Sequence, residues 1–62
     1  MLRYYKVPLV DGIFQGVNYD DDVVEGIAFE KHAENGFGYV STYVEYPFEE
    51  VSEEIFDIER RG

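Results

Sequence analysis

The chain has 62 residues, with 14 aspartates and glutamates against five lysines and arginines, which gives a net charge of −9. At this length we expect one small domain, residues 1–62, that buries only about 60% of its unfolded surface and is marginally stable. The absence of cysteine excludes disulfides and thiolate metal sites, and the negative charge argues against direct binding to nucleic acid or to an anionic membrane.

The N-terminal third predicts two short strands. Residues 2–9 favour the extended conformation, and because Pro8 cannot donate a ladder hydrogen bond, we expect an edge strand or a strand that ends there. Asp11-Gly12 is a turn signal, and residues 13–17 could supply a short return strand. The start of the chain lacks the apolar stretch of a signal peptide, and no run is long enough to span a membrane, so we expect a cytosolic protein or one assembled from the cytosol.

The segment 23–46 carries the strongest pattern, because Asn35-Gly36 lies between two strand-like runs and is typical of a two-residue β-hairpin turn. A type I′ turn at these residues pairs Ile27 with Val44. Four apolar side chains then share one face of the ribbon and form the expected core: Ile27, Phe29, Val40 and Val44. A slip of one residue would split this cluster, which supports the register.

The C-terminal segment predicts a helix. Apolar residues recur at helical spacing, acidic residues fill the other faces, and two arginines stand at the end, where cations suit the helix dipole. The apolar positions are Phe48, Val51, Ile55 and Ile58. The helix begins either at Pro47 or, with Ser52 as N-cap, at Glu53. The expected fold is mainly β or small α+β, an antiparallel sheet of three to four strands built on the 23–46 hairpin, with a short C-terminal helix.

The candidate chemical motifs are incomplete. Asn18, Asp20 and Asp22 have the alternating oxygen spacing of a calcium loop, but glycine and glutamate are missing at its sixth and twelfth positions. Residues 18–22 are therefore expected to form a solvated loop, and no metal site is predicted. His32 is the only histidine, and no nucleophile, base and oxyanion site accompany it. We predict no catalytic residue and no cofactor.

Two surfaces remain as possible interfaces. Tyr39 and Tyr43 fall on the sheet face opposite the expected apolar cluster, where tyrosines suit either an ordinary half-exposed face or a protein contact. The second surface is acidic and contains Glu49, Glu50, Glu53 and Glu54. Its carboxylates could serve solubility alone, or could imitate DNA phosphates and occupy the basic cleft of a nucleic-acid-binding protein.

Three segments carry a resemblance to a known group of proteins: residues 4–9 (Tyr-Tyr-Lys-Val-Pro-Leu), 36–40 (Gly-Phe-Gly-Tyr-Val) and 52–56 (Ser-Glu-Glu-Ile-Phe). In these segments the chain resembles short uncharacterised proteins encoded by phages and prophages of Gram-positive bacteria. The resemblance implies a phage or prophage origin, a location in the host cytoplasm or the virion, and a role as a small virion or tail-associated component or as an inhibitor of a host enzyme. It implies no functional residue.

The expected function is a non-enzymatic structural or protein-interaction module, with a protein partner or self-association into a homo-oligomer. The alternative is an acidic inhibitor or DNA mimic that occupies a basic site on a host nucleic-acid-binding protein. Because a small sheet with one helix has little apolar surface to bury, self-association would help its stability. Charge repulsion opposes this association, so it should strengthen with salt.

Overall fold

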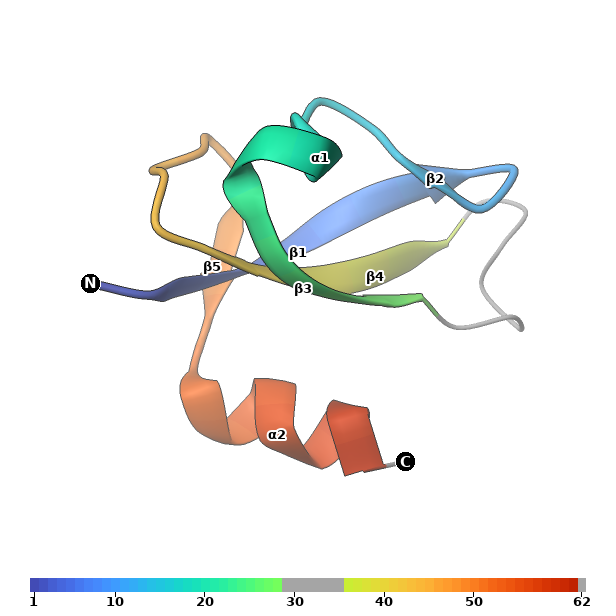
Figure 1. Ribbon diagram of the computed structural model, residues 1–62. Helices are drawn as coiled ribbons and strands as arrows, with labels where there is room; N and C mark the ends of the chain where they lie inside the picture. The colour runs from blue at the N-terminus through green and yellow to red at the C-terminus, as the bar shows by residue number, and fades with distance from the viewer. Residues whose placement is uncertain (29–35, 62) are drawn as a thin grey trace.

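The structure, a computed structural model, describes residues 1–28 and 36–61 and is shown in Figure 1. The elements in chain order are β1 (Arg3–Val10), β2 (Ile13–Phe14), α1 (Tyr19–Asp22), β3 (Val23–Ala28), β4 (Phe37–Thr42), β5 (Glu49–Val51) and α2 (Glu53–Arg61). The expected fold class is confirmed: a small, mainly β structure with an antiparallel sheet and a short C-terminal helix. Neither helix in the described ranges has the length and apolar character needed to cross a membrane.

Strand β1 is the centre of the sheet. The strand order is β2-β1-β4-β3, and β5 also pairs with β1, so one side of β1 faces β4 while the other side faces β5 and then β2. The expectation that this strand lies at an edge or ends at Pro8 is wrong. The Leu9 N–H donates to the Gly36 carbonyl on the β4 side at 3.1 Å, so the nitrogen of Pro8 points to the other side. On that side the Pro8 carbonyl accepts the Gln15 N–H at 2.9 Å, beside the residues of β1 that pair with β2.

The first turn is a two-residue hairpin loop, as the Asp11-Gly12 signal predicted. Val10 pairs with Ile13, and the two residues between them have φ values of 53° and 77°. Two successive positive φ values define the type I′ turn, whose twist matches that of the flanking strands. Glycine adopts this conformation freely, and aspartate tolerates it better than most side chains.

Strands β3 and β4 are antiparallel neighbours, as predicted for 23–46, but their register differs from the prediction. Ile27 lies opposite Tyr39 and not opposite Val44, and the register shifts between Val23 and Glu25. Ile27 therefore lies on the face opposite Val40, so the predicted apolar cluster does not form. Phe29 and Asn35, the first residue of the predicted turn, lie outside the described residues.

Two glycines account for the observed register. Gly26 lies opposite Val40, and Gly38 precedes Val40 by two positions, so both lie on its face of the sheet. A Cβ atom on Gly38 would approach the Phe14 ring to 2.6 Å, and one on Gly26 would approach the Tyr19 hydroxyl to 2.6 Å. These positions accept rings from outside the hairpin, a contact that local pairing within 23–46 could not reveal.

The core lies on the face that carries Tyr5, Val7 and Val40. Tyr5 and Val40 are direct partners across β1 and β4, and all three residues are at most 2% exposed. Five partly buried side chains pack around them: Phe14 of β2, Val17 before α1, Val23 of β3, and Tyr46 and Phe48 of the segment before β5. The β1–β4 pairing thus determines which face of β4 carries this core.

Helix α2 lies on the opposite side of the sheet from α1 (Figure 1). It begins at Glu53, and the Ser52 hydroxyl accepts the Ile55 N–H at 3.2 Å, so the Ser52 N-cap option is confirmed. Its buried residue is Phe56, whose ring centroid lies 4.9 Å from that of Tyr4. Ile55 and Ile58 are exposed, so the predicted apolar stripe was wrong, because residues 49–51 form β5 and do not begin the helix.

Candidate interaction surfaces

An apolar hollow lies between β2 and β3, the two ends of the strand path. Its volume is about 300 Å³, and the residues that line it are Gly12, Ile13, Phe14, Tyr19, Gly26 and Ala28. The Phe14 and Tyr19 rings stack with their centroids 5.6 Å apart and their planes 11° apart. Because Gly26 has no side chain, this ring pair lies close against the backbone of β3. Among the described residues, no charged side chain lines the hollow.

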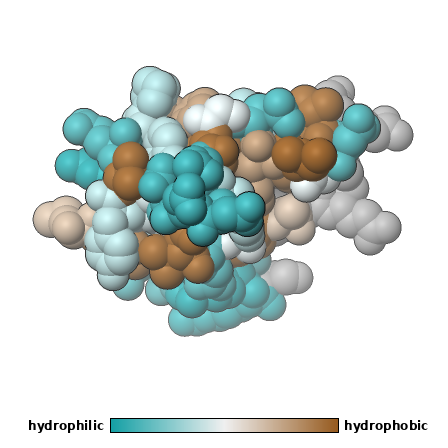
Figure 2. Space-filling model, turned by 45° about the horizontal axis from the view of Figure 1, so that its top comes forward, coloured by the Kyte–Doolittle hydropathy of each residue, from teal (hydrophilic) through white to brown (hydrophobic). Residues whose placement is uncertain are grey.

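Two of the large side chains that line this hollow are exposed. Ile13 is 64% exposed and Tyr19 is 45% exposed. Figure 2 shows hydrophobic residues gathered at the end of the molecule where β2 lies, beside strongly hydrophilic ones. Contiguous exposed apolar surface with a polar rim is typical of sites where proteins contact a partner.

The position of α1, and with it the Tyr19 ring, is fixed by a hydrogen-bond network centred on Asp22. The Tyr46 hydroxyl donates to the Asp22 carboxylate at 2.8 Å, and the Thr42 hydroxyl donates to the Asp22 carbonyl at 2.6 Å. The Asn18 N–H donates to the Tyr46 hydroxyl at 3.2 Å. This N–H lowers the Tyr46 pKa, but burial and the neighbouring Asp22 charge outweigh it, so the pKa of Tyr46 is raised.

The segment 18–22 was expected to form a solvated loop, but Tyr19–Asp22 form one turn of helix, α1, after Asn18. Its oxygen-bearing side chains, which resembled part of a calcium loop, bond to the protein itself: the Asn18 amide donates to the Asp21 carboxylate at 2.9 Å, and Asp22 accepts from Tyr46. Within residues 1–28 and 36–61, no three histidine or carboxylate side chains are grouped so that they could hold a metal ion.

The two tyrosines predicted as an interface differ in exposure. Tyr43 is 68% exposed and follows the end of β4, whereas Tyr39 is half-buried on the α2 side of the sheet. Burial raises the pKa of Tyr39, with added effects of the Glu59 and Glu49 charges. Helix α2 therefore partly covers the face that was expected to be open and aromatic.

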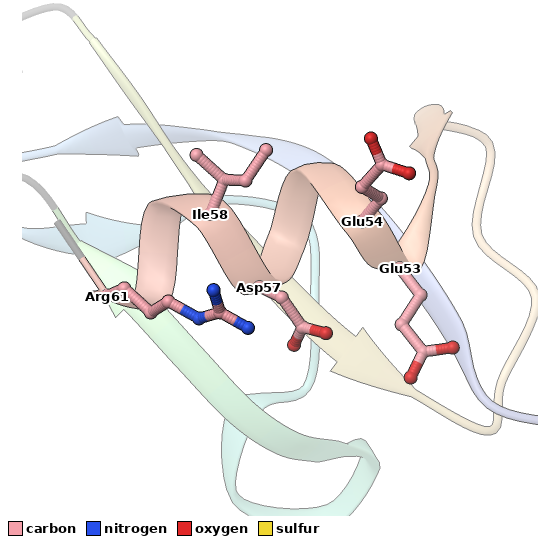
Figure 3. Close-up of a pocket in the computed structure, with 5 residues that line it drawn as sticks. All are labelled: Glu53, Glu54, Asp57, Ile58 and Arg61. Atoms are coloured by element: carbon pink, nitrogen blue, oxygen red, sulfur yellow. The ribbon is translucent and has the colours of Figure 1, made fainter.

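The four predicted acidic residues lie on β5 and the first turn of α2, a region we call the acidic surface: Glu49, Glu50, Glu53 and Glu54. Of these, Glu50 pairs with Arg3 at 3.2 Å. A second hollow of about 320 Å³ lies along α2, where Figure 3 shows Arg61 extending back along the helix towards Asp57. Carboxylates and one isoleucine also line it, so its character is mixed.

Arg60, in the last turn of α2, forms two ion pairs within the fold. Arg60 bonds to Asp57 on its own helix and to Glu25 on β3, the latter at 3.1 Å. The hydrogen bond that Arg60 donates to Asp57, and the nearby carboxylate charges, raise the pKa of Arg60 further above its ordinary value. These pairs join α2 to the sheet edge, but they leave Glu49, Glu53 and Glu54 without an ion pair to any described cationic side chain.

The remaining candidate, His32, lies outside the described residues. Ser41 of β4 is buried, and its hydroxyl donates to the Glu25 carbonyl at 3.4 Å. Comparison with models of known protein families, with curated proteins and with solved structures finds no significant match to this chain.

Sequence reasoning missed the hollow between β2 and β3. One signal was present, since a glycine inside a strand often marks the close approach of another group, and Gly26 is such a residue. The Asp11-Gly12 turn also placed Ile13 and Phe14 directly after it. The sequence pattern did not reveal that the sheet curls, so that β2 and β3, the two ends of the strand path, face one another across the rings of Phe14 and Tyr19.

Proposed function

We propose that this chain is a non-enzymatic protein-interaction module of phage or prophage origin. The observation that supports it is the apolar hollow between β2 and β3, with exposed Ile13 and Tyr19 at its border. Large apolar side chains beside a hollow are the anchoring features of protein interfaces, where they bury against a partner. The partner is a component of the virion or of the host, or a second copy of the chain. The origin rests on the resemblance of residues 4–9, 36–40 and 52–56.

A second candidate function is inhibition of a host protein through the acidic surface. The observation that favours it is the set of carboxylates on β5 and α2 that no described cation neutralises, Glu49, Glu53 and Glu54. Closely spaced exposed carboxylates attract a basic cleft and can replace the phosphates of DNA there. The pairing of Glu50 with Arg3 reduces the charge density of this surface, so we place this function second.

The two functions differ in their response to salt. The tagged chain would be used to capture proteins from a lysate of a Gram-positive host at low and at high salt. Salt separates the two functions because the range of charge interactions falls from about 10 Å at 0.1 M to about 3 Å at 1 M. A partner held by apolar contact remains at high salt and is lost with Ile13→Asp. A partner held by the acidic surface is released by salt and lost with the double variant Glu53→Gln, Glu54→Gln.

The same experiment can contradict both functions. Capture of the same proteins by the wild-type chain and by both variants would show that neither surface selects a partner. Light scattering on the purified chain completes the test, because it detects self-association that a lysate experiment would miss. A monomer mass at all protein concentrations, together with no captured partner, would overturn the proposal.

A further inference from the structure

We propose that the hollow between β2 and β3 binds an extended, basic segment of the partner protein, which adds as a strand to the free edge of β3 and inserts one apolar side chain into the hollow. The inference deepens the proposed function and rests on it.

The first support is the position of β3 in the sheet. Within the described residues β3 pairs only with β4, at one end of the strand path, and β2 at the other end pairs only with β1. The outer side of β3 therefore carries no neighbouring strand from the described ranges. The backbone of an edge strand is a template for another extended chain, and strand addition is a recurring mode of peptide recognition.

The second support is the hollow beside that edge. Its volume of about 300 Å³ lies at the lower limit of small-molecule pockets, which suits one large side chain better than a whole ligand. Its walls are aliphatic and aromatic, from Ile13, Phe14 and Tyr19, and its floor includes Gly26. Because side chains alternate along a strand, an added segment directs every second side chain towards this face and the others towards solvent.

The third support is charge. Asp11 precedes Gly12 of the hollow, Asp20 follows Tyr19, both are exposed, and neither pairs with a described cationic side chain. A bound segment with lysine or arginine at its solvent-facing positions would be attracted by these carboxylates and by the net charge of −9. A second copy of the chain would bring the same carboxylates to the site, so the occupant that fits this charge is a basic segment of another protein.

The test uses the full chain and a fluorescent peptide that alternates lysine with phenylalanine and leucine. Fluorescence anisotropy measures its affinity, and amide shifts in NMR spectra of the chain locate it. A peptide with glutamate in place of lysine controls for charge, and one with a central proline controls for strand addition. We expect shifts in β2, α1 and β3, and at least about tenfold weaker binding of both control peptides.

Variants of the chain separate the hollow from other surfaces. Ile13→Asp and Ala28→Arg change exposed lining residues, so they should fold and yet bind the lysine peptide at least about tenfold more weakly. Ile58→Asp is the matched control, because Ile58 is similarly exposed at 57% but lies on α2. It should bind like the wild type.

Several results would overturn the inference. These are absence of peptide binding, equal binding of the proline peptide, shifts confined to α2, or loss of affinity with Ile58→Asp alone. Concentration-dependent shifts in β2 and β3 without peptide would assign the hollow to a second copy. The proposed function would survive each of these results if lysate capture still required an intact apolar surface, so the two failures are distinguishable.

Discussion

The Tyr46 hydroxyl donates a hydrogen bond of 2.8 Å to the Asp22 carboxylate, which connects the segment before β5 to the end of α1. The Tyr46 backbone N–H also donates to the Tyr5 hydroxyl in the core at 3.1 Å. We expect Tyr46→Phe to lower the free energy of unfolding by about 1–2 kcal/mol, because a hydrogen bond to a charged partner is lost. Urea unfolding of this variant, with Tyr43→Phe at an exposed position as control, provides the measurement. Equal losses in both variants would contradict the role of the Asp22 contact.

The same contact predicts a loss of stability at alkaline pH. Tyr46 has a pKa raised above the ordinary 10.0, so the folded state retains its proton more strongly than the unfolded state does. The stabilisation is fully present below pH 10 and is lost as the pH rises through the higher, folded-state pKa. The pKa values of Tyr4 and Tyr39 are raised as well, with burial as the main cause, so they act in the same direction. Thermal unfolding between pH 8 and pH 12 should show a falling midpoint, and Tyr46→Phe should reduce the slope.

Local signals predicted the features that depend on neighbouring residues. The Asp11-Gly12 turn needed only two positive φ values, and the Ser52 N-cap, one of the two expected starts of α2, needed only its own hydroxyl. Both are determined within a few residues of the chain. The pairing of β3 with β4 was also predicted, since a turn between two extended runs brings them together.

The register and the buried faces could not be predicted from such signals. The Asn35-Gly36 pattern favoured a pairing within 23–46, but the pairing of Val40 with Tyr5 and the rings over Gly26 and Gly38 select another one. These contacts join segments far apart in sequence. For α2, apolar spacing indicated Ile55 and Ile58, whereas the position of Tyr4 under the helix makes Phe56 the buried residue.

The contact between Gly26 and Tyr19 predicts coupling between two substitutions. We expect Gly26→Ala to cost about 1–3 kcal/mol, because the new Cβ would lie 2.6 Å from the Tyr19 hydroxyl and 2.8 Å from its ring. In a Tyr19→Ala background the same change should cost less, with a coupling energy of about 0.5–3 kcal/mol. Gly38→Ala is the control, since its Cβ would meet the Ile27 carbonyl at 2.4 Å, a backbone atom that Tyr19→Ala leaves in place. Additive effects of Gly26→Ala and Tyr19→Ala would contradict the contact.

The buried face of α2 predicts a contrast between two residues of the helix. Phe56→Ala removes a ring that is 1% exposed and packs on Tyr4, so we expect a loss of about 3–5 kcal/mol, enough to unfold much of so small a domain. Ile58→Ala removes an exposed side chain and should change stability by at most about 0.5 kcal/mol. Circular dichroism with thermal melting distinguishes them. A larger loss for Ile58 would restore the helix face that was first predicted from sequence.

Self-association is predicted to depend on salt. Exposed apolar residues such as Tyr43, Ile55 and Ile58 can gain free energy by burial between copies, whereas the charge of −9 opposes contact. Screening shortens the range of that repulsion from about 10 Å at 0.1 M salt to about 3 Å at 1 M, so the mass measured by light scattering should rise with salt and protein concentration. The double variant Glu53→Gln, Glu54→Gln keeps the apolar surface and removes charge, so it should associate at lower salt than the wild type. If both proteins associate at the same salt concentration, general salting-out accounts for the effect, and a constant monomer mass in all conditions would exclude the homo-oligomer.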